Sequence, residues 1–214
     1  ALVIAASNNL EKMVSLIINH ESFDPIESHL NYAFFLSKGA ISQLLSKVKG
    51  LDVNNFAKHV ISDNKHSISI IYPLKSSITR LKTEKFDLII SHPSFDTYKS
   101  NIKEAVISAM IPGGLYFFKK LLKLVNDDIN FFTNEKLLIH AVKSFSGDII
   151  SEILNNKTFD SRKGDIVGAF VASITTIKDT KQGPILVKPS FLFSVMNTLY
   201  NYDQQHEHLI DLAD

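Results

Sequence analysis

One stretch near the middle of the chain constrains the fold most, because two short apolar runs flank a helical pattern. The first run, residues 87–91, is followed directly by His92-Pro93, and proline cannot donate a hydrogen bond to a sheet ladder. Apolar residues then recur at helical spacing over residues 98–110, and Pro112-Gly113-Gly114 separates them from the second run, residues 115–118. The pattern predicts strand, helix and strand, the βαβ unit of an α/β protein.

The rest of the chain extends this alternation. Compact apolar runs predict further strands at residues 1–6, 32–36 and 68–71. Helical spacing predicts helices at residues 10–17, 39–49, 76–83, 134–154 (with a break near Gly147), 189–202 and 207–212. Residues 165–176 and 184–187 predict a closing hairpin around a turn-rich linker. We therefore expect an α/β three-layer sandwich with a mostly parallel, seven-stranded sheet that ends in a β-hairpin. No internal repeat is evident.

Composition sets wider bounds. The 214 residues are 45% hydrophobic and 21% charged, with a formal net charge of +1, which is typical of one globular core and gives no basic footprint for nucleic acid. The absence of cysteine excludes disulfides and Cys-ligated zinc. No apolar run reaches the roughly 20 residues that span a bilayer. Because the chain opens on an apparent core strand, we expect a domain excised from a longer protein.

The central stretch resembles class I S-adenosylmethionine-dependent methyltransferases. Asp-Leu-Ile-Ile-Ser at residues 87–91, the Pro-Ser-Phe that follows His92, and Pro112-Gly113-Gly114 are similar to the framework of that family. The resemblance implies a glycine-rich cofactor loop after the first strand, and Ala5, Ser7 and Asn9 stand where the glycines are expected. The acidic residues that the family places after the second and third strands are missing, so the resemblance implies a vestigial cofactor site.

The catalytic motifs of the family are also incomplete. His92 replaces the Asn or Asp expected at the end of the fourth strand, whereas Phe95 matches the aromatic residue that stacks on a base. Lys119 is similar to the second lysine of a ribose methylation tetrad, and Asp165 corresponds weakly to its final acid. If the chain is active, the resemblance implies that His92, Phe95 and Lys119 are its catalytic residues. No metal site is expected, because His206 and His208 alternate on a predicted helix.

These observations favour a pseudo-methyltransferase: a Rossmann-like domain at residues 1–188 with a C-terminal helical extension at residues 189–214. The expected function is a structural or protein-interaction module of a larger protein or complex, without a cofactor. The alternative is an active, divergent methyltransferase that acts on RNA or DNA and uses S-adenosylmethionine. Other domains or subunits of an assembly are the expected partners, with nucleic acid as a further candidate and no membrane. A cytoplasmic location fits the lack of cysteine.

Overall fold

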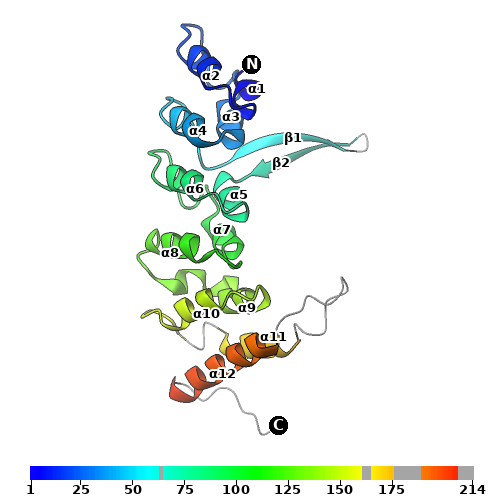
Figure 1. Cartoon of the computed structure of the whole chain (residues 1–214), viewed down its shortest axis with the longest axis vertical. Coiled ribbons are helices and arrows are strands. Elements are labelled where there is room, and N and C mark those ends of the chain that lie inside the picture. Colours follow the sequence, from blue (N-terminus) through cyan, green and yellow to red (C-terminus); the bar gives the residue numbers. More distant parts are fainter. Residues whose placement is uncertain (63–64, 161–164, 176–188, 207–214) are drawn as a thin grey trace. The chain divides into compact units, whose positions relative to one another are not determined.

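The computed structural model describes residues 1–62, 65–160, 165–175 and 189–206 (Figure 1). The chain divides into two compact units, Ala1–Ala105 and Val106–Asp214. Within the described residues both units are built from short helices, and the strands that occur form one antiparallel pair.

The first unit is a stack of helical hairpins, which are pairs of consecutive helices joined by a short turn. Its helices are α1 (Leu2–Ser7), α2 (Glu11–Ile18), α3 (Leu30–Leu36), α4 (Gly39–Leu45), α5 (Pro73–Thr79) and α6 (Thr83–Ile90). Helix α1 packs on α2 and α3, α4 packs on α2, α3 and α6, and α5 packs on α6. The α3/α4 hairpin therefore lies between the α1/α2 and α5/α6 hairpins. Helix α7 (Ile102–Ser108) spans the boundary between the units.

The second unit repeats this construction. It contains α8 (Leu115–Lys123), the 3-10 helix η1 (Ile129–Glu135), α9 (Leu137–Lys143), α10 (Gly147–Leu154), α11 (Ile166–Thr175) and α12 (Pro189–His206). Helix α9 packs on α10 and α11, α8 packs on α10, and α11 packs on α12. Each hairpin thus buries its apolar side chains against a neighbour, which is the packing of repeat proteins.

A short buried pattern recurs in the first helix of the hairpins and in α7. A large apolar residue is followed three positions later by alanine or serine and four positions later by a second, mostly apolar residue, and all are buried. The sets are Leu2, Ala5 and Ala6; Leu30, Ala33 and Phe34; Leu74, Ser77 and Ile78; Ile102, Ala105 and Val106; Leu138, Ala141 and Val142; Ile166, Ala169 and Phe170. Spacing of three and four residues places each set on one helix face, and the small residue allows close approach. Contrary to the sequence-based expectation, the chain contains an internal structural repeat.

The backbone conformation also recurs from one hairpin to the next. The residue before four of these helices has a left-handed conformation, and so does a residue in the turn between the helices of several hairpins. The first group is His29, Asn101, Lys136 and Asp165, and the second is Asn9, Leu81 and Phe145, each seven positions after the first buried residue of its hairpin. A left-handed residue reverses the chain sharply and is uncommon outside glycine. Its recurrence at matching places marks one unit of structure used several times.

The predicted methyltransferase-like sheet is wrong. Strands are predicted at 1–6, 32–36, 87–91, 115–118 and 165–176. The described residues of these segments lie in or at the ends of α1, α3, α6, α8 and α11. No parallel strands and no Rossmann-like α/β layer occur in the described residues, so the resemblance to class I methyltransferases does not extend to the fold.

The burial pattern gives the physical reason. A run of four to six apolar residues fits a buried strand and a short buried helix equally well. In α6, Phe86 and Ile89 are buried while Leu88 and Ile90 are only half-buried, which is helical rather than alternating spacing. Pro112-Gly113-Gly114 precedes a helix, not a strand. Gly114 is required there because a Cβ at this position would lie 2.0 Å from the carbonyl oxygen of Ala109.

Among the predicted strands that fall on described residues, one is a strand in the structure. Residues 68–71 belong to β2 (Lys65–Ile71), which pairs antiparallel with β1 (Phe56–Ser62) as a hairpin between α4 and α5. Most predicted helices are confirmed, including the break near Gly147 that separates α9 from α10. The predicted strand at 184–187, the predicted helix at 207–212 and the predicted division at residue 188 lie outside the described residues.

Candidate functional site

A cleft in the first unit lies between the α3–α4 turn and the α5/α6 hairpin. Its volume is about 330 Å³, and Phe35, Ser37, Lys38, Arg80 and Lys85 are among the residues that line it. Apolar side chains and hydroxyl groups form its wall, whereas several cationic side chains lie around it. This combination of an apolar wall and convergent polar groups is typical of a binding site.

Lys85 forms one wall of the cleft. Its Nζ donates to the carbonyl oxygen of Ser37 at 2.8 Å, to the hydroxyl oxygens of Ser37 and Ser42 at 3.1 Å each, and to the carbonyl oxygen of Phe34. It also lies 4.4 Å from the centre of the Phe34 ring. The carbonyl groups of Phe34 and Ser37 lie at the C-terminal end of α3. A cation there compensates for unpaired acceptors and for the negative end of the helix dipole.

Burial lowers the pKa of Lys85 to about 7, whereas the surrounding oxygens favour the ammonium form, so the two influences oppose each other. Because its N–H groups are already directed at oxygens of α3 and α4, Lys85 joins two hairpins and does not reach out to a ligand.

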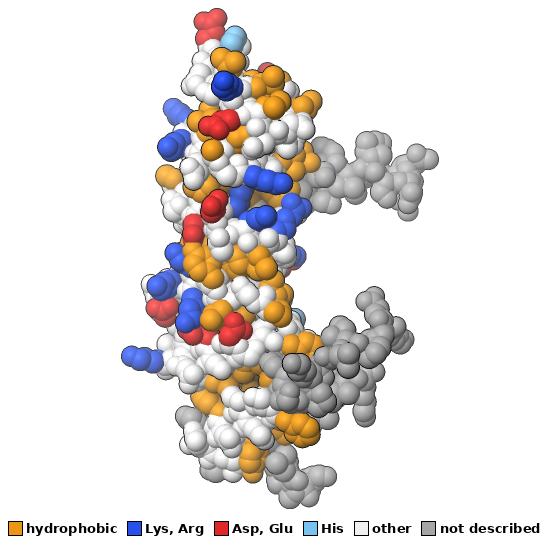
Figure 2. All heavy atoms as spheres, viewed as in Figure 1, with side chains coloured by type: hydrophobic (Ala, Val, Ile, Leu, Met, Phe, Trp, Pro, Cys, Tyr) orange, Lys and Arg blue, Asp and Glu red, His pale blue; other side chains and the backbone are white. Residues whose placement is uncertain are grey.

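Three other cations line the cleft. Lys38, Arg80 and Lys82 are exposed, and Glu84 is the acidic residue among those that line the cleft. The Arg80 guanidinium lies 5.6 Å from the centre of the Phe35 ring, which holds it over an aromatic surface. No ion pair joins any of these three cations to a carboxylate in the described part of the chain. Figure 2 shows lysine and arginine side chains gathered on this face of the first unit.

His92, predicted as a catalytic residue, lies in the loop after α6, where both ring nitrogens contact groups of the protein. Its Nδ1 accepts the N–H of Ser94 at 3.1 Å and lies 2.8 Å from the Ser94 hydroxyl. Because Nδ1 accepts the N–H of Ser94, the proton resides on Nε2, which donates to the carbonyl oxygen of Ser46 at 3.0 Å. The imidazole therefore ties the loop after α6 to the end of α4.

This loop is one copy of a motif that occurs three times. The segments 20–24, 92–96 and 156–160 read His-Glu-Ser-Phe-Asp, His-Pro-Ser-Phe-Asp and Asn-Lys-Thr-Phe-Asp. In each copy the first side chain accepts the N–H of the third residue, at 3.3, 3.1 and 2.9 Å. The same side chain lies 2.8, 2.8 and 2.7 Å from the hydroxyl of that third residue. The similarity of residues 92–95 to a methyltransferase motif is thus explained by a repeated loop.

Asn54 joins two successive loops of the first unit and is 3% exposed. Its Nδ2 donates to the carbonyl oxygen of Ser94 at 2.7 Å, and its Oδ1 accepts the N–H of Asp96 and the hydroxyl of Ser100, both at 2.7 Å. Asp96 in turn accepts the N–H groups of Tyr98 and Lys99, and these bonds, that of Lys99 first, lower its pKa. This network was not predicted from the sequence.

The other predicted site residues are distributed over both units. Phe95 is half-buried in the same loop as His92, whereas Lys119 belongs to the second unit. Lys119 forms an ion pair with Glu152 at 3.0 Å beside a depression of about 380 Å³. Asp165 precedes α11, where it accepts the N–H of Gly168 at 3.0 Å and lies 3.5 Å from Lys136 Nζ.

The predicted cofactor loop is part of a helix and its following turn. Ala5 is fully buried in α1. Ser7 is exposed at the end of the helix, and its hydroxyl donates to the carbonyl oxygen of Ile4 at 3.1 Å. Asn9 is the exposed, left-handed residue of the α1–α2 turn. These three residues shape a helical turn and do not form a glycine-like loop after a strand.

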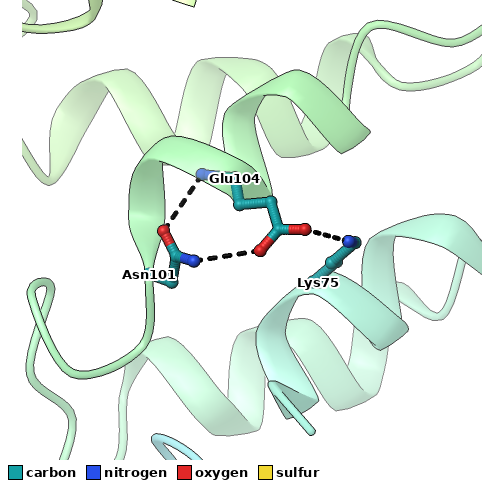
Figure 3. A network of polar contacts seen from close by, with 3 residues as sticks. All are labelled: Lys75, Asn101 and Glu104. Carbon is teal, nitrogen blue, oxygen red and sulfur yellow. Dashed lines mark hydrogen bonds and ion pairs between the residues drawn. The ribbon is translucent and has the colours of Figure 1, made fainter. Parts of the chain in front are cut away.

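A polar cluster joins α5 to the start of α7 (Figure 3). Asn101 Nδ2 donates to one carboxylate oxygen of Glu104 at 2.9 Å, and the Glu104 N–H donates to Asn101 Oδ1 at 3.4 Å. The other carboxylate oxygen forms an ion pair with Lys75. This is a capping arrangement at a helix start, and the two charged side chains are about 40% exposed, so its role is structural.

The described residues contain no cluster of three or more His, Asp or Glu side chains suited to a metal ion. None of the helices that the structure describes has the length and apolar character needed to cross a membrane. Comparison with protein-family models, curated proteins and solved structures finds no match for the chain.

The cleft could have been found from the sequence only by aligning the hairpins. Lys38 and Lys82 both lie eight positions after the first buried leucine of their hairpins, Leu30 and Leu74. In isolation each is an ordinary surface lysine. Stacking of the hairpins brings both to the same cleft, beside Arg80.

Proposed function

We propose that this chain is a protein-interaction module built from helical hairpins, and that its cationic cleft binds an acidic segment of a partner protein. Stacked helical hairpins bury a continuous core and leave their turns and outer faces available for recognition. The observation that carries the proposal is the set of exposed cations around the cleft, Lys38, Arg80 and Lys82, with no carboxylate paired to them in the described structure.

Charge and shape together favour an acidic peptide. Carboxylates of a partner segment would face the three cations, while the Phe35 ring and the apolar wall would take an aliphatic or aromatic side chain. Opposite charge across an interface increases the association rate and the selectivity for the correct partner. The net charge of the chain is only +1, so the positive charge is local and suits a short acidic segment better than a long polyanion.

The test is binding of a fluorescein-labelled 12-residue peptide rich in glutamate and leucine, measured by fluorescence anisotropy at several salt concentrations. We expect binding that weakens with salt, and a weaker affinity after Arg80→Ala and Lys82→Ala, by about two- to five-fold for each rim charge. Lys12→Ala is the matched control, because Lys12 is an exposed lysine of the same unit on α2, and the cleft does not include it.

Three results would contradict the proposal. One is an equal loss of affinity in the Lys12→Ala control. Another is equally tight binding of a lysine-rich peptide of the same length. The third is displacement of the acidic peptide by a single-stranded oligonucleotide that binds more tightly, which would favour a nucleic acid as the occupant of the cleft.

A further inference from the structure

The first hairpin exposes large apolar side chains on the face that α3/α4 does not cover. Ile4 of α1 is 65% exposed, and Met13 and Leu16 of α2 are 50% and 74% exposed. Figure 2 shows hydrophobic side chains on the surface of this part of the first unit. Exposed apolar residues that gather on one face typically mark an interaction surface.

Comparison of Met13 with the equivalent residues of other hairpins indicates what the exposed face of α1/α2 contacts. Met13 lies eleven positions after Leu2, and the residues at the same position of the α3/α4 and α9/α10 hairpins are Ile41 and Ile149. Ile41 is 1% exposed and Ile149 is fully buried. The α3/α4 hairpin has a neighbour on both sides, α1/α2 and α5/α6, whereas among the described helices α1/α2 packs extensively on α3/α4 alone. The position of Met13 is therefore the one that a preceding hairpin covers.

The position beside Met13 supports this reading. Lys12, Ala40, Glu84 and Asp148 stand at the same place in four hairpins, and all four are exposed. This place faces solvent whether or not a hairpin has two neighbours. The exposure of Met13 and Leu16, in contrast, is found where a neighbour is lacking, since Leu44 and Leu88, at the position of Leu16, are half-buried.

We propose that the outer face of α1/α2, formed by Ile4, Met13 and Leu16, binds a further helical hairpin in the register that joins α3/α4 to α1/α2. The covered interface between α1/α2 and α3/α4 supplies the model for the contact. The occupant would bring a buried set like that of α1, a large apolar residue followed by alanine, against Met13. This surface is separate from the cationic cleft, and the proposal does not depend on what the cleft binds.

The experiment places a copy of residues 2–29 directly before Leu2, which preserves the 28-residue spacing between Leu2 and Leu30. The added copy carries Met13→Leu, so that the original Met13 can be followed alone by peptide mapping after mild peroxide treatment. Oxidation of methionine follows its exposure. We expect Met13 to oxidise several-fold more slowly in the extended chain than in the original chain, with the buried Met110 as an internal reference.

A variant and its control distinguish docking of the added hairpin on α1/α2 from an effect of the added residues alone. Leu16→Lys in the original α2 should restore fast oxidation of Met13 in the extended chain and leave it unchanged in the original chain. Lys12→Ala should change neither. Equal oxidation rates in the original and extended chains would overturn the proposal. So would a dimer of the original chain, seen by sedimentation and abolished by Leu16→Lys, because a second copy would then be the occupant.

Discussion

Asn54 is the residue at which the polar contacts between successive loops of the first unit converge. Its amide bonds to Ser94, Asp96 and Ser100, all on the loop after α6. Because it is buried, the groups that it satisfies have no ready access to water if its side chain is removed. At the residue scale, the loops are therefore held by amide and hydroxyl groups as well as by apolar packing.

Replacement of Asn54 tests this role. We expect Asn54→Ala to lower the free energy of unfolding by about 1–3 kcal/mol, the cost of leaving buried polar groups unpaired. The measurement is urea unfolding followed by far-ultraviolet circular dichroism. Asn55→Ala is the matched control, because Asn55 is the adjacent asparagine, is less buried, and donates to the carbonyl oxygen of Lys99 at 3.0 Å. A loss as large in the control as in Asn54→Ala would show that the network has no special contribution.

His92 shows how far single residues could be interpreted from the sequence. A histidine followed by proline, serine and phenylalanine has the residue types of a reactive site, and the sequence alone does not reveal that Nδ1 accepts a neighbouring N–H. The information that distinguishes the two roles was present in the chain, since residues 20–24 and 156–160 repeat the motif. A motif that occurs three times in one chain is better explained by structure than by catalysis.

At the scale of elements, helices with clear apolar spacing could be predicted from the sequence. The secondary structure of short apolar runs could not. Residues 10–17 and 39–49 carry periodic apolar residues, and α2 and α4 lie there, although α4 ends at Leu45. Residues 1–6 and 115–118 are too short to show a period, so the choice between strand and helix depended on an assumed fold. Their helical state is decided by packing against a neighbouring helix.

The β1/β2 hairpin is an insertion between two helical hairpins. Leu2 and Leu30 are 28 positions apart, and so are Leu74 and Ile102, but Leu30 and Leu74 are 44 apart. Removing residues 56–71, which comprise both strands and the two residues between them, restores a spacing of 28. The insertion therefore interrupts the repeat without replacing any part of it.

Deletion of this insertion tests its independence. We expect a chain in which Asn55 is joined directly to Tyr72 to keep its helical circular dichroism and to change its free energy of unfolding by less than about 1 kcal/mol, since loop length has a small effect on stability. Deleting residues 39–54, an equally long segment that contains α4, is the control and should abolish cooperative unfolding. Loss of cooperative unfolding in both chains would mean that the strands are part of the core.

At the scale of the whole molecule, the chain is a set of recurring helical hairpins arranged in two compact units. The fold class was not predictable by reading segments in order, because each hairpin resembles a strand followed by a helix when taken alone. Comparing segments with one another would have revealed the recurring spacing of 28 residues and, with it, a repeat architecture. The cationic cleft depends on how the hairpins stack, since its residues come from two hairpins.

The most direct test of this account is the backbone conformation of the segments that could be strands or helices. The measurement is the set of Cα secondary chemical shifts from nuclear magnetic resonance of the isotope-labelled chain, over Leu2–Ser7, Leu30–Leu36, Thr83–Ile90, Leu115–Lys123 and Ile166–Thr175. The account predicts uniformly positive, helical shifts in all five segments. Negative, strand-like shifts over residues 87–91 and 115–118 would contradict it and would restore an α/β fold.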